Sequence, residues 1–246
     1  METPSVPLSL CTVVDLCKGG WVKLIKLNCL KENLPTCCDI DSFSISICSE
    51  SEKQSLKDFL PKCKSIIVLA HHVKQSIEWT WFPLESERNN ITCAADLHLK
   101  AECEKIVFEL KNKGYNSVII PYPGRSGIRF KDLANKTGLG TIGDNFLFLH
   151  KEWGTWTHLR IIITDVEIVD NLPPCEDVCN HCGICKASCP AKVIKDDTFL
   201  GIECSKYQDK MDADVGIQGS YIFKCEECAR ACPLGNTPKK ITISKY

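Results

Sequence analysis

The pattern of apolar and polar residues along the first 170 positions predicts a mixture of strands and helices. Residues 65–70 form a short, continuous apolar run, which is typical of a buried strand. Apolar side chains then recur at helical spacing from about residue 91 to residue 113, and Gly114 follows as a stop signal. A strand followed by an amphipathic helix is expected here.

The same reasoning predicts further elements up to residue 164. They are a strand at 116–120, a short helix at about 130–136, and apolar strands at 145–150 and 157–164 joined by a turn near 152–154. The first 55 residues carry no comparably clear period. The expected fold class is therefore α/β (α+β).

A change of composition at residues 171–175 predicts a domain boundary. Pro173 and Pro174 separate an apolar segment from a cysteine-rich tail. We expect one domain over residues 1–170 and a second over residues 171–246. A chain of 246 residues is long enough for such a division.

The tail contains two cysteine runs of related spacing. The first run is C-x2-C-x2-C-x3-C-P, and the second is C-x2-C-x3-C-P. The first spacing is the one with which bacterial ferredoxins hold a [4Fe–4S] cluster and send the fourth thiolate to a second cluster. Structural zinc is the alternative, but the two runs supply more thiolates than one zinc ion can use. Two clusters, which carry electrons one at a time, are expected.

The crossed arrangement assigns the ligands of both clusters. Those of cluster one are Cys179, Cys182, Cys185 and Cys232, and those of cluster two are Cys189, Cys225, Cys228 and a fourth cysteine that the second run lacks. Cys204 is favoured for this place because it lies between the runs, whereas Cys175 is expected to be a packed thiol. His181, between two ligands, is either a surface residue or a hydrogen-bonding group that tunes the cluster.

The composition limits the cellular compartment and the classes of partner that are expected. Nine of the 18 cysteines lie between residues 175 and 232, and the remainder are scattered, unlike a secreted disulfide scaffold. A reducing compartment is expected, most simply the cytoplasm of an anaerobe. A net charge of −1 makes nucleic-acid binding unlikely, and neither a signal peptide nor a run of 18 apolar residues predicts a membrane segment.

A glycine-rich loop at residues 138–143 matches the dinucleotide pattern G-x-G-x-x-G. That pattern binds a pyrophosphate only when a strand precedes it and a helix follows it. Here the predicted helix precedes the loop and a strand follows, so nicotinamide binding is disfavoured. Two interpretations stay open: a backbone that approaches a large flat group, or a helix C-cap followed by a tight turn.

The segment Leu133–Leu149, with Trp153-Gly154 and the strand that ends at Asp165, resembles the corrinoid-binding module of epoxyqueuosine reductases and reductive dehalogenases. The family pattern there is A-G-L-G-W-I-G-K-N, then a strand and F-G-x-x-x-x-L. The tail segment at residues 221–228 is similar to the family's R-I-F-G-C-D-D-C, and the segment at 199–207 is similar to the one that supplies a ligand of cluster two, which favours Cys204. The resemblance covers about residues 60–235.

This resemblance implies a nitroreductase-like module that holds cobalamin beside a dicluster ferredoxin domain. The candidate corrinoid-binding residues are Tyr122, Arg125, Gly138, Leu139, Gly140, Thr141, Gly143 and Asn145. The implied activity is a cobalamin-dependent iron–sulfur reduction of a small substrate. The alternatives are a protein that reduces a partner's corrinoid, a plain dicluster ferredoxin, and epoxyqueuosine reductase itself. A ferredoxin or flavodoxin is the expected electron donor, and a corrinoid protein is a further candidate partner.

Departures from the family pattern accompany the resemblance. Gly124 lies at about the place of the family's catalytic aspartate, and Thr141 and Asp144 replace its Trp and Lys. Neither the family's tRNA-gripping repeat domain nor the dehalogenases' twin-arginine signal is expected from these 246 residues. Tyr122 is the candidate proton donor, against the alternative of a turn aromatic packing on prolines. Less specific candidates are Arg129, His71, His72, Trp79, Trp81 and Phe82.

Overall fold

The computed structural model describes residues 12–15, 22–26, 40–84, 87–122, 128–169, 175–215, 225–235 and 237–238. Gly124 and Arg125, two positions singled out from the sequence, lie outside these residues. No helix among the described residues is long and apolar enough to cross a membrane.

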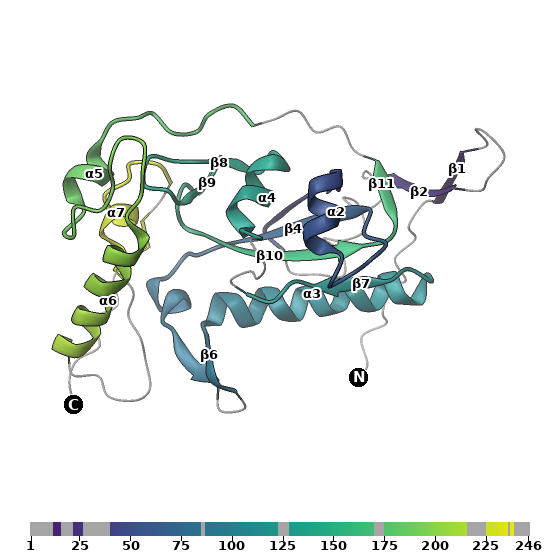
Figure 1. The fold of residues 1–246 in the computed structure, drawn as a ribbon, viewed down its shortest axis with the longest axis horizontal. Coiled ribbons are helices and arrows are strands. Elements are labelled where there is room, and N and C mark those ends of the chain that lie inside the picture. Colours follow the sequence, from purple (N-terminus) through teal and green to yellow (C-terminus); the bar gives the residue numbers. More distant parts are fainter. Residues whose placement is uncertain are drawn as a thin grey trace. The chain divides into compact units, whose positions relative to one another are not determined.

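A four-stranded sheet with helices packed on it confirms the expected mixed α/β fold (Figure 1). The strand order is β3-β4-β10-β7, with bounds Ser42–Ile47, Ser65–His72, Thr157–Thr164 and Ser117–Ile119. β3 pairs antiparallel with β4, and β10 pairs antiparallel with β7. All eight residues of β10 are buried, and these include the polar residues His158 and Arg160 as well as the apolar run from Ile161 to Ile163.

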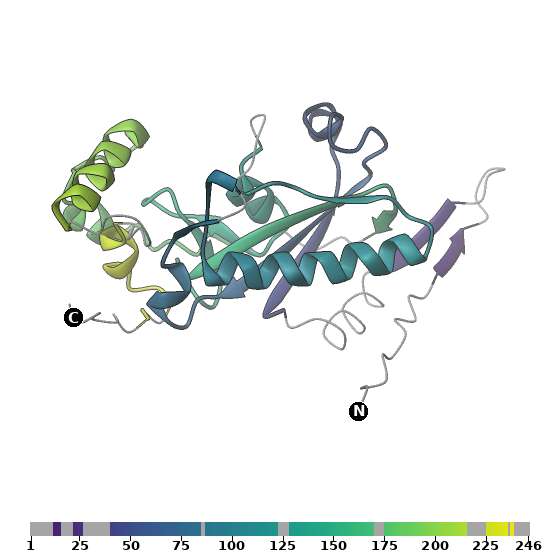
Figure 2. The ribbon, with the colours of Figure 1, turned by 90° about the horizontal axis from the view of Figure 1, so that it is seen from below.

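Helix α3 (Ala94–Asn112) covers one face of this sheet and runs alongside β10 in Figure 2. Its residues Leu99, Ile106 and Leu110 are buried together with Ile67 and Ile162 of the sheet. The helical spacing in the sequence therefore identified a true core face. The prediction was wrong at its beginning, since residues 87–92 form strand β6 (Glu87–Thr92).

Helices α2 (Glu50–Leu56) and α4 (Phe130–Lys136) lie on the other side of β10 from α3 in Figure 1. Glu52 joins them. Its carboxylate accepts hydrogen bonds from the Ser49 backbone at 2.7 Å, which completes a capping box, and from Lys136 of α4. Lys136 also donates to the Ile47 carbonyl at 3.0 Å, so one lysine ties α4 to both α2 and β3.

Glu52→Gln is expected to lower the free energy of unfolding by about 1 to 2 kcal/mol at neutral pH. Burial raises the pKa of Glu52, but the hydrogen bonds from Lys136 and Ser49 outweigh it and hold the pKa below its ordinary value of 4.5. A lowered folded-state pKa gives stability that is present above 4.5 and is lost as the pH falls through the folded-state pKa.

Urea unfolding of both proteins between pH 3 and pH 8 measures this effect. The exposed Glu50, which pairs with Lys53 in its own helix, provides the control variant Glu50→Gln, with an expected change within about 0.5 kcal/mol. A Glu52→Gln deficit that stays constant down to the lowest pH would contradict this explanation.

The remaining strands form small sheets. Strands β1 (Thr12–Asp15), β2 (Val22–Lys26) and β11 (Glu167–Val169) make a three-stranded sheet in the order β1-β2-β11. Strand β5 (Phe82–Leu84) pairs with β6, and β8 (Gly140–Ile142) pairs with β9 (Phe148–His150), both antiparallel. A 3-10 helix, η1 (Ser76–Trp79), precedes β5. The cysteine-rich tail contains α5 (Ile184–Ser188), α6 (Gly201–Val215) and α7 (Glu227–Arg230).

The chain forms two compact units, each assembled from separated segments. Unit 1 comprises residues 1–71, 99–139 and 159–174, and unit 2 comprises residues 72–98, 140–158 and 175–246. The cysteine-rich tail therefore shares a unit with the β8–β9 hairpin. The domain boundary near residue 170 stays a prediction.

Candidate functional site

Four cysteines of unit 2 surround one cavity. Its lining contains Cys179, Cys182, Cys185 and Cys232, which is the set predicted for cluster one. Helix α5 carries Cys185, whereas Cys232 comes from the second run, 43 residues beyond Cys189 in the sequence. The fold thus brings the last cysteine of the second run to the first three cysteines of the first run.

The other four predicted ligands gather in a second group. Cys189 is buried with Val193 and Ile194, and both Cys204 and Cys228 pack against them. Cys225 interacts electrostatically with Cys204 and Cys189. This group contains Cys189, Cys204, Cys225 and Cys228, the set predicted for cluster two.

Burial shapes the acidity of these thiols. Burial, together with the smaller effect of the neighbouring Cys225, Cys189 and Cys204, raises the pKa of Cys228 to about 12. Burial likewise raises the pKa of Cys185, Cys225 and Cys232. Four thiols cannot all ionise at close range without a compensating cation, so each group is suited to a metal centre that displaces the protons as it binds.

Short helices place the ligand candidates. α5 lies between Cys182 and Cys189, and α7 lies between Cys225 and Cys232. Pro190 and Pro233 follow the last cysteine of each run, and α5 and α7 end before them. Each helix thus separates the cysteines of one run, and the final cysteine joins the other group.

The two candidates for the eighth ligand lie in different surroundings. Cys204 is half-buried on α6, packs against the second group, and accepts a hydrogen bond from Gln208 at 3.3 Å. Cys175 is also half-buried, but it does not line the cavity of the first group. This placement favours Cys204.

The glycine-rich loop is a helix C-cap followed by a hairpin. Gly138 has φ +77° and ends α4, with its N–H donating to the Asn135 carbonyl at 3.1 Å. A Cβ on Gly140 would lie 1.9 Å from the Leu149 carbonyl oxygen, and one on Gly143 would lie 2.6 Å from the Leu149 side chain. The local backbone and packing therefore account for the presence of glycine at all three positions. The loop leads into a strand and not into a helix, which is the order that disfavours dinucleotide binding.

The same hairpin borders the first cysteine group. Asp144, Asn145 and Leu149 line its cavity together with the four cysteines. Asn145 is buried, and its side chain accepts a hydrogen bond from the Leu147 N–H at 3.0 Å, which fixes the turn. Leu139, another predicted site residue, is buried where α4 ends. The segment that resembles a corrinoid-binding loop thus continues into the wall of the proposed cluster-one site.

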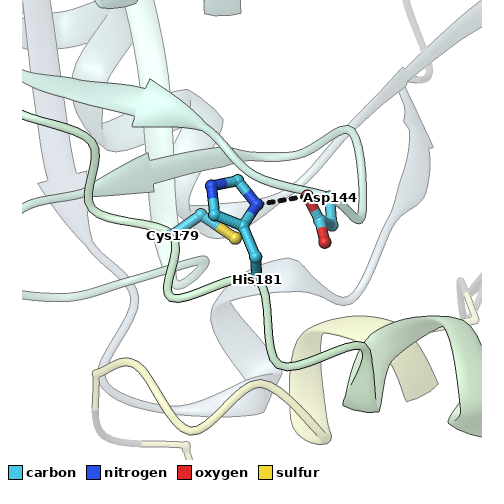
Figure 3. A group of neighbouring side chains, drawn as sticks. All are labelled: Asp144, Cys179 and His181. Atoms are coloured by element: carbon cyan, nitrogen blue, oxygen red, sulfur yellow. Dashed lines mark hydrogen bonds and ion pairs between the residues drawn. The ribbon is translucent and has the colours of Figure 1, made fainter. Parts of the chain in front are cut away.

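Thr141 and Asp144, the two departures from the family pattern, bond to the loop that carries Cys179. The Thr141 hydroxyl donates to Asp177 at 3.1 Å and accepts from the Val178 N–H at 3.1 Å. His181 contacts Asp144 through Nδ1 at 2.8 Å and Asp177 through Nε2 at 3.0 Å. Figure 3 shows the His181 ring directed at Asp144, with Cys179 beside it.

His181 is held by two carboxylates. Its backbone is in the left-handed region, with φ +51°, and its side chain is largely exposed. The hydrogen bonds that His181 donates to the carboxylates of Asp144 and Asp177 raise the pKa of His181. One ligand-type atom each of Asp144, Cys179 and His181 lies within 4.8 Å of the others. If Cys179 binds a cluster, a carboxylate and an imidazole lie immediately beside that cluster.

Thr141→Val is expected to loosen this loop, because it removes two hydrogen bonds without changing the side-chain volume. The expected loss is about 1 to 3 kcal/mol of stability and a faster release of iron to a chelator. Iron release from reconstituted protein measures the effect, with Thr198→Val, a change at an exposed threonine, as the control. Equal rates for the wild type and Thr141→Val would show that the hairpin does not support the cysteine loop.

The turn at Trp153-Gly154 also contacts the tail. A Cβ on Gly154, which has φ +59°, would lie 2.0 Å from the Leu234 carbonyl oxygen. Gly235 has φ +78°, and a Cβ on it would lie 2.1 Å from the Trp153 carbonyl oxygen. The Trp153 ring stacks on two imidazoles, with centroid separations of 3.8 Å to His150 and 5.0 Å to His72. The segment after Cys232 is thus packed against this turn.

The sequence did not predict a buried polar pair in unit 2, formed by His158 and Asp96. His158 Nε2 lies 2.9 Å from Asp96 Oδ1, and the Thr92 hydroxyl donates to Asp96 Oδ2 at 3.0 Å. His158 and Asp96 are both almost fully buried. Both lie among apolar residues at core positions of β10 and α3, so the pattern gave them no separate signal.

The other sequence candidates have ordinary surroundings. Tyr122 packs edge-on against Phe130 at 5.8 Å between ring centroids, and the Arg160 guanidinium lies 5.5 Å from its ring centre. Arg129 pairs with Asp132 in its own helix. His71 lies 2.7 Å from Asp41. Trp79 and Trp81 pack against a buried cluster in unit 2, and Phe82 begins β5.

No model of a known protein family matches the chain. Curated relatives do match. The epoxyqueuosine reductase of Aliivibrio fischeri is 29% identical over 143 residues, which are 55% of this chain and 37% of the relative. That of Vibrio cholerae is 32% identical over the same shares, and that of Bacillus subtilis is 23% identical over 72% of this chain and 49% of the relative. The matches span about a third to a half of the length of these relatives.

Solved structures share the fold. A selenomethionine-labelled epoxyqueuosine reductase superposes with a TM-score of 0.62 at 20% identity, over 83% of this chain and 65% of that one. A reductive dehalogenase described in connection with B12-dependent dehalogenation gives 0.58 at 14% identity, over 92% of this chain and 35% of that one. The resemblance to epoxyqueuosine reductases and reductive dehalogenases is confirmed.

One neighbour of similar fold was solved together with nucleic acid. An epoxyqueuosine reductase solved with a modified tRNA stem loop has a TM-score of 0.61 at 21% identity, over 83% of this chain and 64% of that one. A net charge near zero averages over the whole surface, whereas binding depends on local patches. The charge of this chain therefore does not exclude an RNA partner.

Proposed function

We propose that this protein is an iron–sulfur oxidoreductase that passes electrons singly through two [4Fe–4S] clusters to a corrinoid, which reduces a small substrate. The observation that carries the proposal is the division of eight cysteines into two groups of four that cross between the two sequence runs. In this proposal Cys179, Cys182, Cys185 and Cys232 hold cluster one, and Cys189, Cys204, Cys225 and Cys228 hold cluster two.

The β8–β9 hairpin supports the corrinoid part of the proposal. Its residues Asp144, Asn145 and Leu149 line the cavity of the first cysteine group, so a cofactor held by the hairpin would lie beside cluster one. A bound corrinoid supplies a low-valent cobalt, which is a strong nucleophile and reductant. The chain's part is to hold the cofactor with the segment from Gly138 to Asn145 and to keep water from the buried wall at Leu149.

The electron donor is proposed to be a ferredoxin or flavodoxin, because cluster reduction proceeds in single-electron steps. Tyr122 is proposed as a proton donor to the substrate. The Arg160 guanidinium lies 5.5 Å from the centre of the Tyr122 ring and places a positive charge beside it. Arg125 is proposed as a further contact of the corrinoid on sequence grounds alone.

A second candidate function is the reduction of a partner protein's corrinoid without a substrate of the chain's own. Gly124 stands near the place where the family pattern has its catalytic aspartate, which favours this candidate. Thr141 and Asp144 favour it as well, because both replace family residues and are engaged with the Cys179 loop.

Addition of cobalamin to the anaerobically reconstituted protein tests the proposal. We expect the visible spectrum to shift to that of base-off cobalamin, and reduction of the clusters to reduce the bound cofactor. The absence of any spectral shift would overturn corrinoid binding by this chain. Reduction of a separate corrinoid protein without binding would establish the second candidate, and turnover of an epoxyqueuosine-modified tRNA stem loop would identify the substrate as that of the relatives.

A further inference from the structure

Two buried cysteines outside the proposed cluster sites lie in direct contact. The Cys48 and Cys63 sulfur atoms are 3.0 Å apart, and both residues are at most 4% exposed. Both belong to unit 1. Cys48 follows strand β3 directly, and Cys63 lies two residues before β4.

The sheet register fixes this contact. β3 and β4 pair antiparallel as far as Ile47 opposite Ser65, and the Cys48 N–H continues the ladder by donating to the Lys64 carbonyl at 2.8 Å. The two thiols are therefore held together by a backbone that neither can leave without breaking the pairing. A disulfide bond is about 2.05 Å long, so the sulfur atoms need to approach by only about 1 Å.

The two thiols are chemically unequal. A hydrogen bond from the Cys48 thiol, helped by the Thr164 backbone, lowers the pKa of Cys63, although burial opposes this effect. The same hydrogen bond and burial raise the pKa of Cys48. Cys63 is consequently the sulfur that reacts as a thiolate, and Cys48 is the neighbour that can resolve an oxidised intermediate.

We propose that Cys48 and Cys63 form a dithiol that a small peroxide oxidises reversibly to a disulfide. The Cys63 thiolate attacks one peroxide oxygen, the O–O bond breaks, and Cys63 becomes a sulfenic acid. The hydroxide that leaves takes up the proton that Cys63 lost and becomes the first water. The Cys48 thiol then attacks the Cys63 sulfur, the S–O bond breaks, and the leaving hydroxide takes the Cys48 proton to become the second water. The two thiols together lose two electrons and two protons, and hydrogen peroxide becomes two water molecules.

Burial alone is also compatible with a passive role, because a buried cysteine behaves as a small apolar side chain. Cys93 and Cys103, both fully buried, offer the comparison. The observation that points beyond a passive role is the 3.0 Å contact between the Cys48 and Cys63 sulfur atoms. The disulfide would close the loop that carries α2 and would connect the ends of β3 and β4.

Peptide mapping tests the proposal on the full-length protein. Cleavage after Asp and Glu releases residues 42–50 and 59–78, and each peptide contains a single cysteine. After treatment with hydrogen peroxide, we expect these two peptides to appear joined, at about two mass units below their sum, and to separate after reduction with dithiothreitol. Recovery of both as singly alkylated peptides after peroxide treatment would overturn the proposal.

Two variants sharpen the result. Cys48→Ser is expected to abolish the joined peptide and to leave Cys63 trapped as a sulfenic acid, detectable with dimedone. Cys103→Ser, a change at an equally buried thiol, is expected to leave the joined peptide at wild-type yield. If Cys48→Ser does not fold, the wild-type mapping still decides the question, and a joined peptide that forms only after unfolding would count against the proposal.

Discussion

Replacing Cys204 with alanine is expected to remove about half of the iron from the reconstituted protein, whereas replacing Cys175 should remove almost none. Cys204 packs with Cys189 and Cys228 in the second group, and Cys175 lies away from the cavity of the first. A [4Fe–4S] cluster that loses one of four thiolates is exposed to loss of iron. Iron and sulfide per chain, measured after anaerobic desalting, check this expectation.

The two cysteines make a matched pair, since both are half-buried members of the same unit. Thermal unfolding of each metal-free variant provides the control for a general folding defect. Loss of iron in Cys175→Ala, with full iron in Cys204→Ala, would reverse the assignment of the eighth ligand.

Gly154→Ala is expected to destabilise the protein by about 2 to 5 kcal/mol and to impair binding of cluster one. A methyl group at this position would meet the Leu234 carbonyl oxygen at 2.0 Å, and the backbone φ of +59° is itself unfavourable for alanine. Leu234 lies two residues after Cys232, so the collision would displace a proposed ligand of cluster one.

The variant Gly114→Ala separates the effect of the steric collision from the effect of the backbone strain. Gly114 has φ +83°, but a Cβ there meets nothing within 4 Å, so only the backbone strain of roughly 1 to 2 kcal/mol applies. Urea unfolding measures stability, and the ratio of iron to protein measures cluster binding. Equal iron content in the two variants would show that the packing of Gly154 on the tail does not position Cys232.

Periodic elements were predictable from the sequence. The strand at 65–70, the short helix at 130–136 and the strand at 157–164 correspond to β4, α4 and β10. They were predictable because each buries a face or a whole strand, and burial imposes a pattern of apolar residues. The duplicated cysteine spacing likewise indicated two groups of thiols before any geometry was known.

Other features depend on contacts that a linear pattern does not contain. Helix α6 was not predicted, because most of its described residues are exposed and its apolar residues therefore show little helical periodicity. Asp96 and His158 are 62 residues apart in the sequence, and only the packing of α3 and β10 brings them together. The hydrogen bonds of Thr141 and Asp144 to the Cys179 loop also arise from folding. In the sequence, each of the two is simply a polar residue in a loop, and such residues are common.

The contacts of Asp144 explain one departure from the family pattern. Asp144 stands where the pattern has lysine, and it contacts both His181 and, at 3.6 Å, Lys186. The hairpin is thereby tied to the loop of the first cysteine group through opposite charges. A lysine at position 144 would face Lys186 and His181 and would repel them.

The central claim is that two groups of four thiolates hold two [4Fe–4S] clusters. Determination of iron, acid-labile sulfide and zinc per chain after anaerobic reconstitution tests it most directly. The account predicts about eight iron and eight sulfide and no zinc. One or two zinc ions per chain with no sulfide would contradict it, because the cysteines would then be structural zinc ligands.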